Sequence, residues 1–434
     1  MKLRMMLYRS FVYFGSLMTR SSFSSARATV GLAVVLLTTS ACLGPSADVE
    51  EPQDVTLDGV RAAAYISSPA QDVGDSSAGH LVLVDEAGEI SVAETSGMDT
   101  AAIGWSEDGL FFSDTEQDYQ LTAEGLRTTD SPKAPSQHAL FPTGDGGFIG
   151  LFNKGTTGVG YTEQLVTHTD GASSRKNVEG YYQVAGSCDG EIYGLAQPSG
   201  DYEQVAAKQG LEIRGTHGPA SFMLTRLSGD DSSSSDLPEA DAVGQNERLV
   251  GMAPVSGSAQ QNHDAPCREE TMYHLAAVAD DSGNPERPVV LRAWDVSTGE
   301  VVETPLTDAN GESVRPNSSY GLAILDSTVL SDDGQSFLWA SLDRQAFMRT
   351  DIDTGKTVEE FPLEDEIVPR SSEVSATIRD DRLALITQTS DGDEPELRIY
   401  DQSTGESLMH TSLPDMSDLL EGPHQLRSMA LRPE

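Results

Sequence analysis

The sequence has few basic residues, three cysteines and no catalytic motif that would assign an activity. Its 28 lysine and arginine residues face 69 aspartate and glutamate residues, giving a net charge of −41. A domain this acidic repels nucleic-acid phosphates and anionic lipid surfaces, so no nucleic-acid partner is expected. Calcium remains possible as a ligand because hard cations bind clustered oxygens, although no stretch has the spacing of a helix-loop-helix calcium loop.

Motifs for enzyme chemistry are also missing. The sequence contains no Gly-x-Ser-x-Gly elbow, phosphate-binding loop or dinucleotide fingerprint. The eight histidines are dispersed, without His-x-His or His-Glu-x-x-His spacing, so no metal site is expected. The acid pairs Asp351/Asp353 and Asp391/Asp393 could serve hydrolysis, but each lies in a predicted turn, where aspartate has a conformational role. We therefore predict no catalytic residue and no cofactor apart from the possible calcium.

No apolar run is long enough for a membrane-spanning helix, which needs about 20 residues. The longest one near the N-terminus, Ala28–Leu37, follows five basic residues and no acidic one, and it precedes small residues. A basic segment, a short apolar core and small residues are typical of a signal peptide. We therefore predict a signal peptide over residues 1–41 and an acidic exported domain after it.

The residues at the predicted cleavage site are Ser40-Ala41-Cys42. They resemble the lipobox of bacterial lipoproteins, and the resemblance implies that Cys42 is acylated and becomes the first residue of the mature chain. Residues 42–58, rich in Gly, Pro, Ser, Asp and Glu, would then be a flexible tether. The alternative is an ordinary secretory signal that happens to contain a cysteine.

The cysteine count agrees with a lipid anchor. If Cys42 carries the lipid, Cys188 and Cys267 remain as an even pair in an oxidising compartment. We predict a disulfide between them, with two free buried thiols as the alternative.

Internal repeats organise the rest of the chain. Three segments share a β-rich run, an aspartate, a Thr-Gly turn and a second alternating run: Leu291–Leu306, Phe347–Leu363 and Leu397–Leu413. Their turn glycines, Gly299, Gly355 and Gly405, lie 56 and 50 residues apart. This pattern is typical of β-hairpins. Weaker copies of the turn occur at Gly88, Gly125, Gly171 and Gly210, which makes seven in all.

A second set of turns separates the first two strands of each unit, as in Ser187-Cys-Asp-Gly190 and Ser331-Asp-Asp-Gly334. Each unit can then be divided into four strands, a to d, within about 40 to 55 residues, the pattern of propeller blades. The first unit, starting at Val60, lacks strand a, whereas the chain ends on Leu426–Glu434, which looks like an isolated strand a. We predict that this last strand completes the first blade and closes a ring.

The repeats resemble the broad β-propeller group of WD40-like, YVTN-type and quinoprotein-like proteins. The resemblance covers about Val60 to Glu434, and we predict a propeller domain over residues 59–434. The resemblance implies an all-β fold, a single propeller of seven four-stranded blades, with six or eight as alternatives. It implies no activity. Trp294-Asp295 echoes the WD dipeptide in one unit only, and we expect Trp294, Trp105 and Trp339 to pack between blades.

The predicted blades place the longer connections on one face, as b–c and d–a loops. These loops are residues 68–79, 153–163, 280–287, 307–319, 390–396 and 413–424. Variation in loops on a rigid scaffold is where binding sites occur, so we expect this face to bind the partner. Residues at the starts of strand a would surround the central opening there, which gives four candidate ligand-binding residues: His138, Tyr182, Tyr320 and Arg427.

Three functions are compatible with these observations. The first is a monomeric, lipid-anchored, non-enzymatic binding platform for an envelope protein or polymer at the outer face of the cell membrane. The second is an extracytoplasmic propeller enzyme, a hydrolase or a quinone-dependent dehydrogenase, because propeller active sites draw single residues from many blades. The third is a sensor of a small ligand. Neither the ligand nor the partner follows from the sequence.

Overall fold

The local chemistry of the Thr-Gly turns determines the most regular hairpins. Asp401 Oδ1 accepts hydrogen bonds from the backbone N–H groups of Ser403 and Thr404, at 3.0 and 2.8 Å. Gly405 then adopts a φ of 69°, in the left-handed region that suits glycine. Asp295 and Asp351 make the same type of turn. Turn geometry thus explains the presence of Asp351, one of the acids considered for hydrolysis. The pair Asp391 and Asp393 lies outside the described residues.

The same glycines also allow adjacent blades to approach each other. A Cβ atom on Gly355 would lie 2.1 Å from the carbonyl oxygen of Pro305, on the outer strand of the preceding blade. A Cβ atom on Gly405 would lie 2.6 Å from the ring of Phe361, again one blade earlier. The repeated glycine therefore serves both the turn and the contact between blades.

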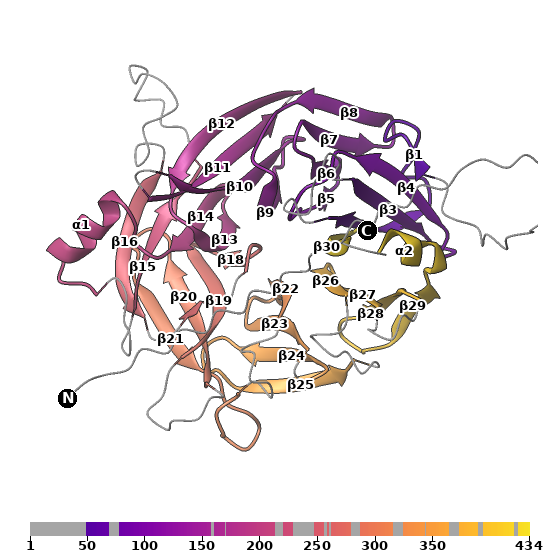
Figure 1. Ribbon diagram of the computed structural model, residues 1–434. Helices are drawn as coiled ribbons and strands as arrows, with labels where there is room; N and C mark the ends of the chain where they lie inside the picture. The colour runs from indigo at the N-terminus through magenta and orange to yellow at the C-terminus, as the bar shows by residue number, and fades with distance from the viewer. Residues whose placement is uncertain are drawn as a thin grey trace, which may run out of the picture. The chain divides into compact units, whose positions relative to one another are not determined.

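The computed structural model shows a ring of sheets around a central axis (Figure 1). It describes residues 49–68, 78–157, 160–169, 171–212, 220–228, 247–255, 258–259, 262–278, 287–315, 324–342, 344–363, 373–388, 394–420 and 424–434. The predicted signal peptide, Cys42 and Tyr320 lie outside these residues.

Seven sheets are formed by the described residues, one per blade, and each is antiparallel except where noted. Blade 1 contains β30 (Gln425–Leu431), β2 (Val60–Ser67), β3 (Gly79–Asp85), β4 (Ile90–Thr95) and β1 (Val49–Glu50). Blade 2 contains β5 (Gly104–Ser106), β6 (Gly109–Ser113), β7 (Gln117–Thr122) and β8 (Gly125–Asp130). Blade 3 contains β9 (Ser136–Pro142), β10 (Phe148–Thr157), β11 (Gly160–Thr169) and β12 (Ala172–Glu179).

The remaining four blades follow in chain order. Blade 4 contains β13 (Tyr182–Cys188), β14 (Glu191–Ala196), β15 (Ala220–Arg226) and β16 (Arg248–Val255). Blade 5 contains β17 (Ser258–Ala259), β18 (Cys267–Arg268), β19 (Thr271–Ala277), β20 (Val289–Asp295) and β21 (Val301–Pro305). Blade 6 contains β22 (Ile324–Leu330), β23 (Ser336–Ser341), β24 (Ala346–Asp351) and β25 (Thr357–Pro362). Blade 7 contains β26 (Glu373–Arg379), β27 (Arg382–Gln388), β28 (Glu396–Asp401) and β29 (Ser407–Ser412).

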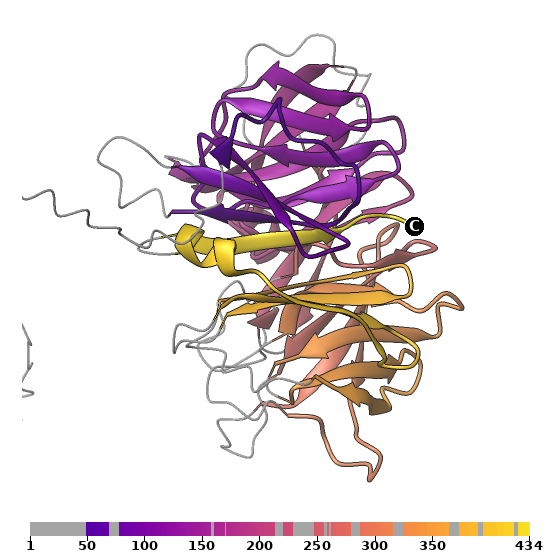
Figure 2. The same cartoon turned by 90° about the vertical axis from the view of Figure 1, so that its right-hand side faces the viewer.

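The ring closes as predicted. Strand β30, from the C-terminus, pairs antiparallel with β2, for example Ala63 with Ala430. Figure 2 shows this strand in yellow beside the strands of blade 1. The fold is therefore an all-β propeller of seven blades.

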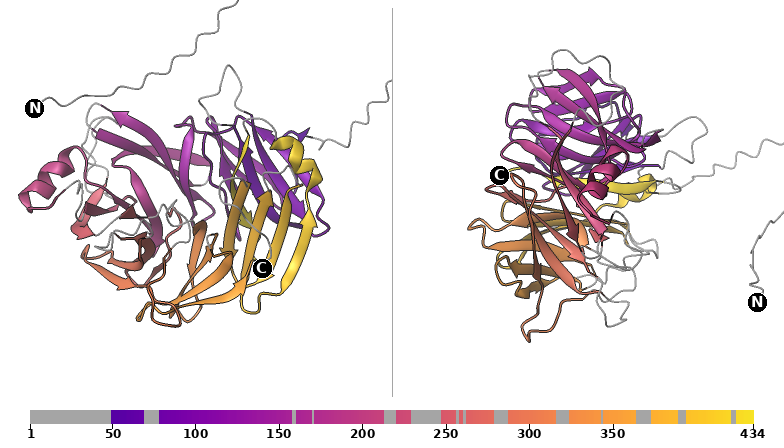
Figure 3. Two further views of the ribbon diagram at one scale, coloured as in Figure 1. Left: turned by 60° about the horizontal axis from the view of Figure 1, so that its bottom comes forward. Right: turned by 90° about the vertical axis from the view of Figure 1, so that its left-hand side faces the viewer.

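Two parts of the predicted organisation need correction. The predicted flexible tether covers residues 42–58, but within it β1 pairs in parallel with β4 and Val55 is buried in the blade 1 core, at 3% exposure. The folded domain therefore begins before residue 59. Gly210 was assigned to the c–d turn of the fourth unit, but it follows helix α1 (Asp201–Lys208), which connects strands b and c at the outer side of the ring (Figure 3).

The predicted loops hold a few regular elements. Residues 153–163 largely extend the β10–β11 hairpin and are not an irregular loop, with pairs from Asn153–Glu163 to Thr157–Gly160. Helix α2 (Pro414–Leu419) lies in the last d–a connection.

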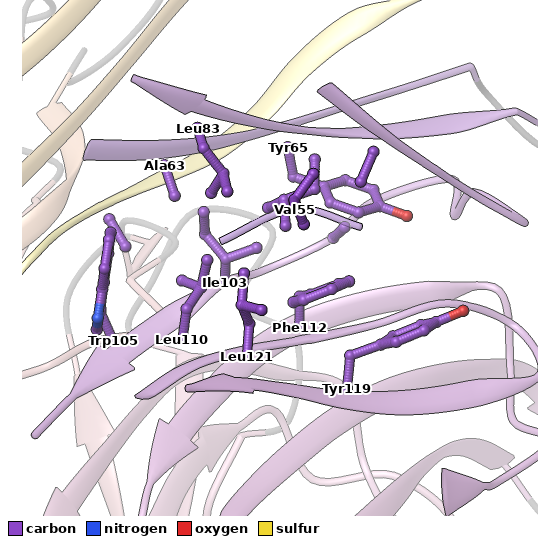
Figure 4. Close-up of a cluster of buried hydrophobic side chains, with 14 of the residues drawn as sticks. Val55, Ala63, Tyr65, Leu83, Ile103, Trp105, Leu110, Phe112, Tyr119 and Leu121 are labelled. Atoms are coloured by element: carbon purple, nitrogen blue, oxygen red, sulfur yellow. The ribbon is translucent and has the colours of Figure 1, made fainter. Parts of the chain in front are cut away.

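The core lies between the blades. Ala63, Tyr65 and Leu83 of blade 1 point toward Leu110, Phe112 and Leu121 of blade 2, as Figure 4 shows. The three tryptophans are buried in three such clusters, with Trp105, Trp294 and Trp339 at 3%, 1% and 1% exposure. Their predicted role in packing is confirmed.

Candidate functional site

The innermost strands of the ring surround a cavity of about 680 Å³. Residues at both ends of β9, from Gln137 to Pro142, line it, so the cavity follows these strands along much of their length. Lining residues also come from β5, β22, β26, β30 and the segment before β18. The cavity therefore draws side chains from blades 1 to 7.

Blade 5 contributes in an unusual way because its inner strand is interrupted. Strands β17 and β18 pair with opposite ends of β19, and between them the chain leaves the blade. Residues 262–266, here named the inner loop, run instead beside β13. The backbone N–H of Asn262 donates to the carbonyl of Gln183 at 3.0 Å, and the N–H of Ala265 donates to that of Ala185 at 2.9 Å. This excursion places His263 and Asp264 on the cavity wall.

Several contacts hold the inner loop in place. The side-chain amide of Asn262 donates to Thr328 Oγ1 at 2.9 Å, and its carbonyl oxygen accepts the N–H of Asp264 at 3.0 Å. A Cβ atom on Gly186 would lie 2.2 Å from the carbonyl oxygen of Ala265, so only glycine permits this close approach. The predicted disulfide between Cys188 and Cys267 is present and fixes the loop at its C-terminal end, with 5.3 Å between the Cα atoms.

A stack of aromatic rings forms one side of the site. The rings of His138 and His263 are nearly parallel, with centroids 5.2 Å apart, and the ring of Tyr181 meets His138 edge-on at 5.4 Å. Burial lowers the pKa of His263 to about 3, helped by the neighbouring His138 and opposed by a hydrogen bond to the backbone of Tyr182. His263 is therefore neutral at physiological pH; its one N–H donates to the backbone of Tyr182, and Nε2 is left as an acceptor.

A buried carboxyl group supports His138 from behind. Nδ1 of His138 lies 3.3 Å from Oε1 of Glu163, whose side chain is inaccessible to solvent. Burial raises the pKa of Glu163, and His138 and a hydrogen bond from the backbone N–H of Tyr182 oppose this shift. A histidine oriented by a carboxylate has a fixed ring position, which suits recognition or proton transfer.

Three formally charged side chains line the cavity: Arg379, Arg427 and Asp264. Arg379 Nη1 donates to the carbonyl of Trp105, and Arg427 Nε donates to Ser67 Oγ at 3.2 Å. Asp264 is exposed to the cavity but enclosed by the surrounding protein, which raises its pKa to about 6 against the opposing charge of Arg379. The carboxyl group of Asp264 is thus partly protonated in mildly acidic conditions.

Several polar atoms on this wall have no hydrogen-bond partner among the described residues. They are Gln137 Nε2, His263 Nε2, Arg379 Nε and Ser428 Oγ. Buried polar atoms are nearly always paired in folded proteins, because each unpaired one costs about 1–3 kcal/mol. The wall of this cavity therefore keeps hydrogen-bonding capacity that water or a bound molecule can fill after small side-chain movements.

The structure brings together two of the four candidate residues. His138 and Arg427 line the cavity, Tyr182 lies in the core with its hydroxyl donating to the carbonyl of Glu179 at 2.7 Å, and its neighbour Tyr181 takes the wall position. Tyr320 falls outside the described residues. The sequence interpretation missed His263, Asp264 and Arg379. The nearest signal was the long segment before Cys267, whose disulfide ties it to blade 4.

Neither a metal centre nor a membrane span emerges from the part of the chain that the structure describes. Within it, no three His, Cys, Asp or Glu side chains gather as metal ligands. Across the same residues, no helix has the length and hydrophobicity needed to cross a membrane.

Comparisons with known proteins agree with the fold and leave the function open. Residues 55–212 match the family described as YycP, beta-propeller domain. No curated protein matches the chain. Similar solved structures include a mutant of Synechocystis ACO, at 10% identity over 88% of this chain and 94% of that one, with a TM-score of 0.47.

Two further structures show the same level of similarity. The β-propeller domain of the Trilobed protease from Pyrococcus furiosus is 10% identical over 85% of this chain and 96% of that one, with a TM-score of 0.46. A protein described as a putative 6-phosphogluconolactonase from Bacteroides fragilis is 13% identical over 87% and 99%, with a TM-score of 0.43. Identities this low say nothing about activity. The chain is a seven-bladed β-propeller of the broad β-propeller repeat group, and its residues 55–212 match the YycP propeller family.

Proposed function

We propose that this protein is an exported, lipid-anchored binding protein that takes a small polar ligand into the central cavity of its propeller. The observation that carries the proposal is the set of unpartnered polar atoms around one cavity. At about 680 Å³ the cavity has the size of ordinary small-molecule sites, which span about 300–1,000 Å³. The inner loop also supports the proposal. It interrupts the inner strand of blade 5, is held by a disulfide and buried hydrogen bonds, and presents His263 and Asp264 to the cavity.

A filled cavity tests this function directly. Ala102 lies on the cavity wall, and Ala102→Trp would occupy the space of a ligand. We expect small molecules released by denaturing the purified wild-type protein to include one species, identified by mass spectrometry, that is absent from Ala102→Trp. Ala87→Trp, at an exposed turn, is the matched control and should retain it. The absence of any species that depends on the cavity would contradict the proposal.

Anchoring through Cys42 is part of the same proposal and has a separate test. Cys42→Ser removes the thiol that would be acylated. We expect the wild-type protein to sediment with membranes and to incorporate a labelled fatty acid, and the variant to do neither. Sedimentation without the label would instead favour attachment through a membrane partner.

An envelope protein or polymer as a second binding partner stays a proposal that rests on the loop-bearing face. Crosslinking on intact cells, followed by mass spectrometry, tests it. One recurring envelope protein linked to the residues of the b–c and d–a connections would support a docking platform held by a monomeric propeller. Links only to abundant bystanders would contradict it.

A hydrolase is the second candidate function, and one observation favours it. His138 and the buried Glu163 form a pair in which the carboxyl group orients the imidazole at the cavity wall. Such a pair could act as a general base on a bound molecule. If the molecule captured from cells is converted by the wild-type protein and not by Glu163→Gln, the enzymatic function replaces simple binding.

A further inference from the structure

The sign of charge in the cavity is opposite to that of the chain as a whole. The chain carries 69 acidic against 28 basic residues, whereas the cavity wall holds two arginines and one aspartate. Acidic groups on the outer surface act weakly in the cavity, because at physiological ionic strength charges beyond about 8 Å are largely screened. Ligand selection therefore depends on Arg379, Arg427 and Asp264, and on Asp380, which lies 3.9 Å from Arg379.

Two of the unpartnered atoms call for hydrogen-bond acceptors, whereas Nε2 of the neutral His263 is itself an acceptor. Arg379 Nε and Gln137 Nε2 are N–H donors without an acceptor among the described residues. A ligand oxygen reached by a small side-chain rotation would take up these donors without breaking an existing hydrogen bond. Oxygen-rich ligands consequently form more hydrogen bonds with these donors than ligands that bring further N–H groups.

Arg379 is the best-placed cation for such a ligand. Its backbone ends β26, its Nη1 is held by the carbonyl of Trp105, and its side chain keeps 32% of its surface exposed. Its nearest acidic partner, Asp380, stands 3.9 Å away and is itself 46% exposed, so the pair is loose. With Nη1 held by Trp105 and Nε buried, the guanidinium group binds a carboxylate through a charge-assisted hydrogen bond from its remaining nitrogen, and Nε joins it only after the side chain rotates.

Asp264 opposes the binding of an anion, and a variant without its charge tests whether the ligand is an anion or a cation. Its carboxylate repels an anionic ligand and attracts a cationic one. Removing its charge must therefore strengthen the binding of one class and weaken that of the other. The two arginines outnumber it on the wall.

We propose that the cavity ligand is a small organic anion whose carboxylate is bound by the guanidinium group of Arg379, with Gln137 and the histidine stack completing its contacts. This inference rests on the proposed binding function and names its ligand class. Arg427, on the neighbouring inner strand β30, adds positive charge to the wall. Its Nη1 donates to Gln425 Oε1 at 2.7 Å, which limits its freedom, so Arg379 is the principal binding residue.

Three sugars of one ring size test the effect of ligand charge on binding while the shape of the ligand stays nearly constant. D-glucuronate, D-glucose and D-glucosamine carry an anionic, a neutral and a cationic group, and each fits the cavity. Binding is measured by isothermal titration at constant ionic strength. We expect glucuronate to bind about tenfold more tightly than glucose, and glucosamine to bind most weakly.

Variants assign the effect to the cavity. Arg379→Met should remove most of the preference for glucuronate, Arg379→Lys should keep part of it, and Asp264→Asn should strengthen glucuronate binding several-fold. Arg349→Met is the matched control, because Arg349 pairs with Glu360 on another part of the molecule and should change nothing. Circular dichroism melting curves show which variants are folded.

The outcomes distinguish this inference from the proposed function. A preference for glucosamine, or a loss of glucuronate binding in Asp264→Asn, overturns the anion while leaving small-ligand binding intact. Unchanged selectivity in a folded Arg379→Met overturns the role of Arg379. No binding of any of the three sugars, together with no captured species, overturns both.

Discussion

Glu179 shows how a single buried acid couples this fold to pH. Only 2% of the residue is exposed, and its Oε1 accepts the backbone N–H of Asp201 at 3.0 Å. Glu247, also buried at 7% exposure, accepts the hydroxyl of Tyr202 at 3.0 Å. Burial raises the pKa of Glu179 from 4.5 to about 7, and the nearby charges of Glu247 and Asp201 add to the shift.

Stability should therefore fall as the pH rises through this range. Between about 4.5 and 7 the native state holds a proton on Glu179 that the unfolded state releases. Because stability rises with pH only where the unfolded state binds more protons, the free energy of unfolding decreases here. Glu179→Gln should flatten the decrease, so that its advantage over the wild type grows from pH 5 to pH 8 in urea unfolding curves.

An exposed acid nearby provides the control for this pH effect. Glu212→Gln changes the same charge at a residue in contact with solvent and should leave the pH profile unchanged. If Glu179→Gln and the wild type have parallel profiles, Glu179 titrates normally and the pH effect has another source.

The candidate site shows what a single residue pattern can and cannot predict. His138 and Arg427 were found because residues near the start of the innermost strand of a blade border the central opening. The prediction of Tyr182 was one residue off, because Tyr181, which precedes the first residue of β13, is the one that lines the cavity. His263 and Asp264 could not be found in this way, because they belong to no strand.

At the scale of elements, hairpins with local turn chemistry were predictable and blade 4 was not. The hairpin of β28 and β29 coincides with the predicted repeat segment Leu397–Leu413 to within a residue, since Asp401 and Gly405 determine the turn without help from distant residues. In blade 4, helix α1 separates β14 from β15 in sequence. Pairing across such a distance depends on the rest of the ring.

The inner loop is the element on which binding depends, and the disulfide should control it. Cys188→Ser with Cys267→Ser frees the C-terminal end of the loop while leaving the hydrogen bonds of Asn262 in place. We expect the free energy of unfolding to fall by about 2–5 kcal/mol, as for other native disulfides that close long loops. Ligand capture should fall as well, because His263 and Asp264 lose their fixed positions.

A reducing agent separates the disulfide from the substitutions. It should weaken ligand capture by the wild type and have no further effect on the double variant, as measured by mass spectrometry of the released molecules. Full capture by the reduced wild-type protein would show that the hydrogen bonds to β13 hold the inner loop without the disulfide.

At the scale of the whole molecule, the ring closure was predictable because the two termini are complementary. Unit 1 lacked a strand and the C-terminus supplied one, and β2 and β30 indeed pair along six residue pairs from Ala62–Leu431 to Ser67–Gln425. The outer strand β1 was not predictable, because its two residues carry no strand pattern of their own. Closure also uses side chains: Arg432 Nη1 donates to the carbonyl of Leu57 at 2.8 Å.

Removing the closing strand should therefore disrupt the entire ring. A chain that ends at His424 leaves β2 of blade 1 and β26 of blade 7 without the neighbour that packs against both. Exposed strand edges promote association, so we expect loss of the cooperative melting transition and elution as large species in size-exclusion chromatography. A chain that begins at Glu51, which removes only β1, is the control and should stay monomeric with a melting temperature a few degrees lower. Restoration of the transition by a synthetic peptide of residues 425–434 would show that pairing with β2 supplies the missing stability. A truncated chain that melts like the wild type would instead show that the blades are stable without ring closure.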